Sequence, residues 1–297
     1  MDQNDWLTDR FEEHRDRLRA VAYRMLGSAA EAEDAVQEAW LRLHRTDTSD
    51  VENLGGWLTT VVARICLNML QARRSRREES LDAHVPDPIV RLEEEVGPEE
   101  QALLADSVGL ALLVVLEALD PPERLAFVLH DMFDVPFDEI APIVGRSPTA
   151  ARQLASRARR RVKGIAPVPD ADLSRQREVV DAFLAAARAG DFEALLEVLD
   201  PDVLLRADRG AVPAGASRVV RGAEAVAGLA LSYSRQLGSR VRPALVNGAP
   251  GFVSRTPDGR PFSVMGCTVS RGRIVEIDIL ADPARLAQID LADLEDG

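Results

Sequence analysis

A basic segment in the middle of the chain, residues 147–163, carries six basic side chains and no acidic one. An exposed helix that only needed solubility would mix both signs, because opposite charges four residues apart stabilise a helix. At helical spacing the polar residues share one face, where arginine and glutamine could bind base edges in a DNA major groove: Thr149, Arg152, Gln153, Ser156 and Arg160. Beside that face, where they could meet phosphates, lie Arg157, Arg159, Arg161 and Lys163. The segment therefore predicts contact with duplex DNA.

The surrounding sequence predicts the helix-turn-helix that would position these side chains. A first helix is expected over 137–144, where Ala141 leaves room for a second helix to cross and Gly145 supplies the turn. Ser147 can cap the second helix, and Ala151 belongs to its inward apolar face. With the start of the second helix included, the candidate DNA contacts are Arg146, Ser147, Thr149, Arg152, Gln153, Ser156, Arg157 and Arg160.

Two earlier helices carry further candidate binding surfaces. Ser28 and Glu31 form a capping-box pattern that starts a helix running to about His44. Its outer face combines one leucine with acidic and amide side chains, as a protein-docking surface or a solvated face would: Asp34, Gln37, Glu38 and Leu41. The next helix is expected from Trp57 to about Arg77, and it carries the ring and basic groups that bind single-stranded nucleic acid: Trp57, Arg64, Asn68, Arg73 and Arg74. Trp57 could equally be a core anchor.

Composition bounds the class of protein. The 297 residues, 46% apolar and 29% charged, suit a globular chain of about two domains. The net charge of −13 argues against nucleic-acid binding by the chain as a whole, yet residues 136–164 hold seven basic and two acidic side chains. Cys66 and Cys267 are expected in the core and exclude a disulfide framework. An acidic N-terminus and apolar runs of at most nine residues predict a cytoplasmic protein without membrane spans.

The sequence changes character after residue 172, where two helices precede a series of strand-like segments with one helix, 223–237, among them. This order predicts an α+β domain with a curved antiparallel sheet. An isomerase-like enzyme stays open as an alternative, with Asp208 or Asp278 as a general base in a pocket. However, no histidine follows His130 to shuttle a proton, and the four histidines lack ligand spacing. We therefore expect no enzyme, no catalytic residue, no metal site and no cofactor.

Several segments resemble the extracytoplasmic-function group of sigma factors. Residues 32–41, AEDAVQEAWL, resemble the region 2 helix that binds RNA polymerase, and 57–64, WLTTVVAR, resemble the start of the promoter-melting helix. Residues 120–129, DPPERLAFVL, and the helix-turn-helix at 137–163 resemble region 4. The resemblance implies an alternative sigma factor that directs promoter recognition and transcription initiation.

The resemblance also implies a role for each candidate surface. The surface from Asp34 to Leu41 would bind the clamp helices of the polymerase β′ subunit. The 57–77 helix, together with Asn53, would hold the unpaired −10 element of the promoter, and the helix-turn-helix would bind the −35 element as duplex. A flexible acidic linker would span the distance between the two elements.

The last third of the chain resembles the SnoaL-like extension of one sigma subgroup, an NTF2-like cone. Residues 84–88, HVPDP, resemble the linker box of that subgroup without its aromatic residue, 281–286, ADPARL, resemble a second box, and 207–210, ADRG, partly resemble a glycine-rich one. The resemblance implies that this domain contacts the rest of the chain in cis and modulates it, with any small-molecule ligand unknown. The implied contact residues are Pro86, Asp87, Pro88, Asp208, Arg209, Gly210, Asp282, Pro283 and Leu286.

The expected architecture is multidomain: two all-α sigma domains followed by an α+β NTF2-like cone. The boundaries are 1–79 for region 2, 80–98 for the acidic linker, 99–165 for region 4 and 171–297 for the SnoaL-like domain. The rival interpretation is a ligand-responsive helix-turn-helix repressor or activator that acts without replacing sigma. Such proteins bind two-fold sites as dimers, and that interpretation leaves the helices at 28–77 unexplained.

Overall fold

The chain folds into two compact units in a computed structural model that describes residues 3–46, 51, 53–76, 84–91, 109–210, 218–237, 240–289 and 291. The first unit combines Met1–Ser80 with Val115–Ile165, and the second combines Leu81–Val114 with Ala166–Gly297. The described part of the expected linker, residues 84–91, thus falls in the same unit as the C-terminal domain. Among the described residues, no helix is long and apolar enough to cross a membrane.

The first unit begins with three packed helices, which are α1 (Gln3–Leu26), α2 (Ala29–Arg45) and α3 (Leu54–Arg76). Gly27 ends α1 with a left-handed φ of 70°, a conformation that suits glycine. Ser28 then caps α2 by accepting the Glu31 N–H at 3.5 Å. The expected reciprocal capping box is only half made, because the Glu31 carboxylate pairs with Arg73 on α3. This pair joins the beginning of α2 to the end of α3.

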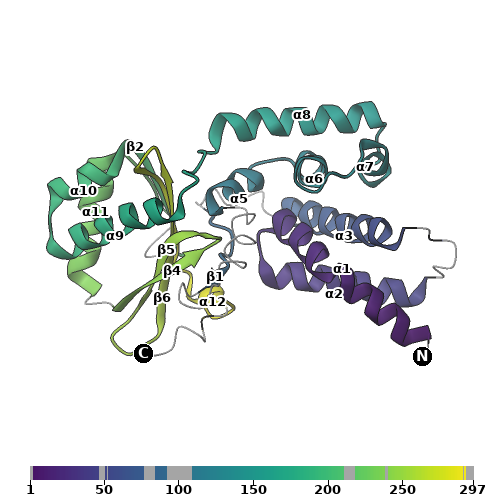
Figure 1. Ribbon diagram of the computed structural model, residues 1–297, viewed down its shortest axis with the longest axis horizontal. Coiled ribbons are helices and arrows are strands. Elements are labelled where there is room, and N and C mark those ends of the chain that lie inside the picture. The colour runs from purple at the N-terminus through teal and green to yellow at the C-terminus, as the bar shows by residue number, and fades with distance from the viewer. Residues whose placement is uncertain are drawn as a thin grey trace. The chain divides into compact units, whose positions relative to one another are not determined.

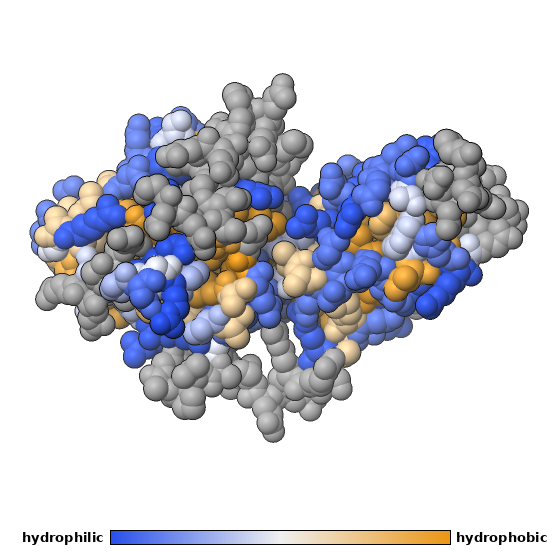
Figure 2. Space-filling view, turned by 90° about the horizontal axis from the view of Figure 1, so that it is seen from below, coloured by the Kyte–Doolittle hydropathy of each residue, from blue (hydrophilic) through white to orange (hydrophobic). Residues whose placement is uncertain are grey.

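The same unit continues with shorter helices after α5 (Leu110–Glu117), namely α6 (Pro121–Phe127), a π-helical turn (Val128–Met132), α7 (Phe137–Val144) and α8 (Pro148–Ile165). The expected helix 123–132 is therefore an α-helix that widens into a π turn. Leu125, Leu129 and Ile140 are fully buried, so α6, the π turn and α7 share one core. In the space-filling view, hydrophilic residues predominate on the first unit, with apolar ones exposed in scattered places (Figure 2).

The second unit is a curved sheet with three helices, α9 (Leu173–Ala189), α10 (Phe192–Val198) and α11 (Ala223–Leu237), on one side (Figure 1). The strands are β1 (Val90–Arg91), β2 (Leu199–Asp208), β3 (Arg218–Arg221), β4 (Arg240–Val246), β5 (Ala249–Arg255), β6 (Pro261–Ser270) and β7 (Arg273–Leu280), and the short helix α12 (Pro283–Leu286) follows. They lie in the order β1-β4-β5-β6-β7-β2-β3.

The expectation of an antiparallel sheet needs one correction, because β2 and β7 pair in parallel. All other strand pairs are antiparallel. The helix α11 lies between β3 and the meander from β4 to β7 in the chain. This connection lets the last strand, β7, lie parallel to β2. Since alternate residues of a strand point to opposite faces, β2 and β7 each present apolar residues to the helices and charged ones to the other side.

Both cysteines lie in the cores, as expected from their apolar surroundings. Cys66 on α3 and Cys267 on β6 are free and buried. Burial raises the pKa of each thiol to about 12. Neither thiol is therefore ionised near neutral pH, and the thiolate is the reactive form.

Candidate nucleic-acid interface and linker contacts

Helices α7 and α8 form the helix-turn-helix expected from the sequence. Gly145 ends α7 with φ 63° and ψ 38°, and its N–H donates to the Ala141 carbonyl. The Arg146 N–H donates to the same carbonyl at 3.0 Å, which closes the turn. Ser147 caps α8 by accepting the Ala150 N–H at 3.2 Å. Pro142 stands within α7, which is only eight residues long.

Helix α8 buries alanines and exposes the residues that the sequence assigned to DNA. Ala151, Ala155 and Ala158 face the core of the unit. The exposed residues of the turn and helix include every candidate: Arg146, Ser147, Thr149, Arg152, Gln153, Ser156, Arg157 and Arg160. The Arg152 guanidinium lies 5.2 Å from the centre of the Phe137 ring, which supports it at the start of the exposed face. The first half of α8 therefore presents a polar face that a DNA groove could accept.

The second half of α8 is fixed to its own unit by ion pairs that sequence reasoning missed. The buried Glu123 carboxylate on α6 accepts from Arg157 Nε at 2.7 Å and from Arg161 Nη1 at 3.3 Å. Arg159 Nε donates to Asp131 at 2.7 Å. Three of the arginines expected at phosphates thus position α8 on α6 and on the π turn. Glu123 and Asp131 lie in an acidic stretch of the sequence, but only the fold shows which arginines they face.

Some of the residues expected at unpaired DNA are exposed, and others make contacts within the first unit. Arg64 and Asn68 are exposed on α3, and Trp57 is half-buried near its start. Asn53 caps α3 by accepting the Gly56 N–H on its side chain at 2.9 Å. Arg73 donates to the Leu26 carbonyl at 3.1 Å in addition to pairing with Glu31. Arg73 therefore holds the three N-terminal helices together.

Helix α3 also contacts the helices around α7 within the first unit. Arg64 Nη2 lies 3.4 Å from the Pro142 carbonyl, and Arg74 pairs with Asp120, the residue before α6. Arg124 on α6 is buried and donates to the Met25 carbonyl of α1 at 2.6 Å. Two of the α3 residues assigned to DNA, Arg64 and Arg74, thus contact the part of the unit that contains the helix-turn-helix.

The residues expected to form a docking surface lie on the outer face of α2. Asp34 and Gln37 are exposed, and Glu38 is half-buried, with its carboxylate accepting from Arg42 Nε at 2.9 Å. The Leu41 side chain, 42% exposed, is one of the large apolar residues that remain at the surface. An exposed leucine among carboxylates suits a partner that offers both an apolar contact and positive charge.

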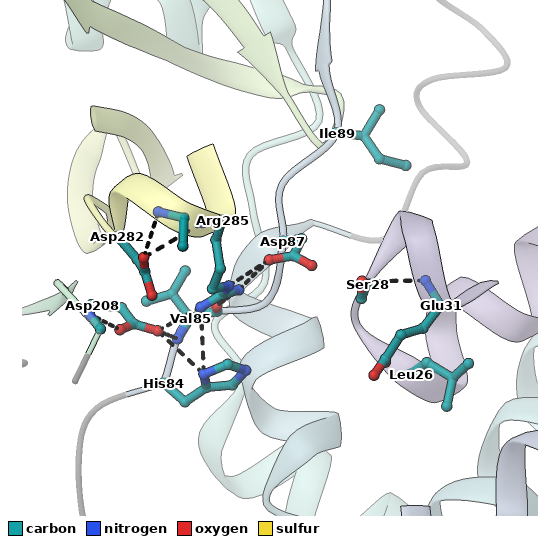
Figure 3. Close-up of polar contacts among 12 residues, drawn as sticks. Leu26, Ser28, Glu31, His84, Val85, Asp87, Ile89, Asp208, Asp282 and Arg285 are labelled. Atoms are coloured by element: carbon teal, nitrogen blue, oxygen red, sulfur yellow. Dashed lines mark hydrogen bonds and ion pairs between the residues drawn. The ribbon is translucent and has the colours of Figure 1, made fainter. Parts of the chain in front are cut away.

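Arg285 of the C-terminal domain makes three contacts around the linker box (Figure 3). Arg285 on α12 donates to the Asp87 carboxylate from Nε, to Asp208 Oδ2 from Nη1 and to the Val85 carbonyl from Nη2, at 2.7, 2.7 and 2.6 Å. The Val85 N–H in turn donates to Asp208 Oδ2 at 3.0 Å. Arg285 therefore binds both a backbone carbonyl, that of Val85, and a side chain, that of Asp87, in the linker box.

Residues 84–91, which we call the strap, continue along the sheet. Ile89 and Asn247 exchange two hydrogen bonds, Ile89 N–H to Asn247 Oδ1 at 3.0 Å and Asn247 N–H to the Ile89 carbonyl at 2.8 Å. Val90 and Arg91 form β1, an edge strand beside β4. Val85, Pro86 and Pro88 are buried. The flexible linker expected from the sequence is thus fixed over these residues, because the strap supplies apolar side chains and a strand edge that the sheet can pair.

Asp208 is the ionised centre of the strap contacts. Burial alone would raise the pKa of Asp208, but hydrogen bonds from His84, Val85 and Gly210 and the positive charge of Arg285 outweigh it and hold the pKa well below its usual range. The Gly210 N–H donates to Asp208 Oδ1 at 3.0 Å. Gly210 has a φ of 71°, and a Cβ there would collide with the Asp282 carboxylate, which caps α12. Asp208, Gly210 and Asp282 thus belong to one constellation.

The remaining predicted contact residues lie elsewhere or play lesser parts. Leu286, the last residue of α12, is buried, and Pro283, the first, is exposed. Arg209 points to the other face of the sheet, where its guanidinium lies 5.2 Å from the centre of the Tyr233 ring. Arg285, the central donor, was missed because its partners are about two hundred residues away in sequence. Only the likeness of 281–286 to a family box pointed to this segment.

The two carboxylates weighed as catalytic bases are engaged elsewhere. Asp208 binds the strap, and Asp278 is buried beside Glu276, both paired with Arg206 at 2.7 and 2.6 Å. Neither Asp208 nor Asp278 is among the described residues that line the pocket between helices and sheet. No group of three potential metal ligands lies together in the described part of the chain.

Comparisons with known proteins agree with this arrangement. Residues 10–76 match Sigma-70 region 2, and residues 109–162 match Sigma-70, region 4. The ECF RNA polymerase sigma factor SigJ of Mycobacterium tuberculosis is 38% identical, over 92% of this chain and 91% of that protein. A probable ECF sigma factor, SigI of the same species, is 36% identical over 96% and 97% of the two chains. The crystal structure of SigJ matches with a TM-score of 0.75 and 35% identity, covering 96% of this chain and 99% of that one.

Proposed function

Because the chain belongs to the extracytoplasmic-function sigma factors of the sigma-70 family, it directs RNA polymerase to promoters, and we propose how its residues divide that task. It has two all-α sigma regions followed by an α+β domain, as the sequence predicted. Family membership accounts for both α1–α3 and the helix-turn-helix, whereas the repressor interpretation explains only the latter. The finer assignments below are proposals.

We assign the polymerase and promoter contacts to three helices. The exposed face of α2, from Asp34 to Leu41, docks on the clamp helices of the β′ subunit. Trp57, Arg64 and Asn68 of α3 hold the unpaired −10 strand, and Asn53 keeps the start of α3 in place by capping it. The exposed face of α8 binds the −35 duplex, chiefly through Arg152, Gln153 and Arg160, while the arginines paired with Glu123 and Asp131 orient the helix.

The C-terminal domain modulates this activity in cis by holding the strap. The observation that carries the proposal is the binding of Val85, Asp87 and Asp208 by the single side chain of Arg285. The strap lies in the segment that joins region 2 to region 4. Fixing the strap therefore shortens the part of this linker that can change its conformation. We therefore expect the domain to restrict how far apart the two promoter elements can be.

Transcription from promoters with different spacings between the −10 and −35 elements tests this proposal. Purified chain and polymerase core are assayed with Arg285→Ala and, to change only the linker side, with Asp87→Ala. Both variants lose charge-assisted hydrogen bonds, each worth about 1.5–3 kcal/mol, and should transcribe from a broader range of spacings. Arg260→Ala is the control, because this exposed arginine pairs with Asp258 in a hairpin. Spacing profiles that match the unmodified chain in both strap variants would overturn the proposal.

A further inference from the structure

The C-terminal domain contains a pocket of about 350 Å³ between α9, α11 and the helix-covered face of the sheet. Most of its lining is apolar, with Phe183, Leu205, Phe252 and Ile277 among the buried contributors. At about 30 Å³ for each water-sized group, the pocket holds roughly a dozen non-hydrogen atoms. Its size and lining are those of a small-molecule site.

The charged residues of the pocket are all of one sign. Arg188 on α9, Arg209 directly after β2 and Arg218 on β3 line it, and no described lining residue is acidic. The nearby carboxylates belong to the other face of the sheet, since Asp208 binds the strap and Asp278 pairs with Arg206. Over its described lining, the pocket therefore offers an anion positive charge and no carboxylate.

Neutral polar groups in the pocket are few. Ser254 and Ser263 face each other across β5 and β6, with 2.6 Å between their hydroxyl oxygens, and both side chains are buried. Tyr233 lies under the Arg209 guanidinium, which orients that arginine by a cation–π contact. The pocket thus combines apolar walls with cationic groups and four hydroxyl-bearing residues, Tyr233, Ser234, Ser254 and Ser263.

We propose that this pocket binds a carboxylate with an apolar body of about ten carbon atoms. The apolar walls take up the body, and Arg209 and Arg218 bind the carboxylate, because guanidinium groups match its two oxygens. A ligand with a neutral or cationic head would lose these charge-assisted bonds. The binding proposal does not depend on the role of the strap.

Calorimetric titration of the full-length chain in the absence of polymerase tests the proposal, with decanoate as the probe. Decanol and decylamine serve as head-group controls. Decanoate should bind at least tenfold more tightly than either, since a charge-assisted hydrogen bond corresponds to about a tenfold or larger change in affinity. Equal binding of the three compounds, or no binding of decanoate, would overturn the assignment.

Matched variants locate the binding. Arg218→Gln should weaken decanoate binding at least tenfold, because Arg218 lines the pocket. Arg221→Gln is the matched control and should not weaken it. Arg221 lies on the same strand, but its charge acts on Glu276 on the opposite face of the sheet. Ala230→Phe, which fills the pocket from α11, should abolish binding. Thermal unfolding of each variant checks that it is folded. Undiminished binding in both Arg218→Gln and Ala230→Phe would place decanoate outside the pocket and refute the proposal.

Discussion

At the scale of single residues, Asp208 shows how one ionised carboxylate can fix a segment far away in sequence. It accepts hydrogen bonds from the Val85 backbone and from Arg285, and Gly210 behind it leaves no room for a larger residue beside Asp282. A neutral side chain in its place would keep the shape but lose the charge that pairs with Arg285. The strength of strap binding should therefore follow the ionisation of Asp208.

This dependence predicts how acid affects the strap. The pKa of Asp208 is depressed with the strap bound, so its contribution is fully present above about pH 3.9, the ordinary aspartate pKa, and is lost as pH falls below that value. Hydrogen exchange of the Val85 amide, corrected for intrinsic rates, should show constant protection from pH 7 to about pH 4.5 and falling protection at lower pH. Asp208→Asn should lower protection at neutral pH by about tenfold or more and make the acid-dependent loss smaller. Asp258→Asn, in an exposed hairpin, is the control. Equal pH profiles of Val85 protection in the unmodified chain and in Asp208→Asn would contradict the role assigned to Asp208.

At the scale of elements, α8 divides into a half that is free to bind and a half that is anchored. Arg152 is exposed and rests on Phe137, whereas Arg159 pairs with Asp131. Arg152→Ala should weaken transcription that depends on the −35 sequence by about 1–3 kcal/mol and relax the base preference at one position. Arg159→Ala should leave that preference unchanged. Measurement across a set of −35 variants distinguishes the two, and an unaltered preference in Arg152→Ala would count against base contact.

The elements also show what the sequence could and could not predict. Local patterns sufficed for the helix-turn-helix and for α11, whose bounds match the expected 223–237, because capping residues and apolar periodicity act over a few residues. They did not predict β1, since Val90 and Arg91 become a strand only by pairing with β4, about 150 residues later. Likewise, Arg73 and Arg157 resembled DNA contacts, and only the fold revealed their partners Glu31 and Glu123.

At the scale of the molecule, the first unit joins two regions that have to act at separate places on a promoter. Elements at −35 and −10 lie about 25 base pairs apart, or about 85 Å at 3.4 Å per pair. A compact unit of about 130 residues is roughly 36 Å across. Helices α3 and α8 therefore cannot reach both elements while Arg124 holds α6 to α1 and Arg74 pairs with Asp120. We therefore expect the unit to open when α3 and α8 bind the promoter as proposed.

Energy transfer between dyes on Cys residues placed at Arg45 and Lys163, both exposed, measures this opening. Cys66 and Cys267 are buried and should stay unlabelled. Transfer should be efficient in the free chain and fall when polymerase core and promoter are added.

Arg124→Met should lower the transfer efficiency already in the free chain, because the substitution removes a buried charge-assisted hydrogen bond worth about 1.5–3 kcal/mol. Asp120→Ala should have a smaller effect, since an exposed ion pair contributes at most about 1 kcal/mol. Efficient transfer that persists in the transcribing complex would show that the two regions reach the promoter without separating.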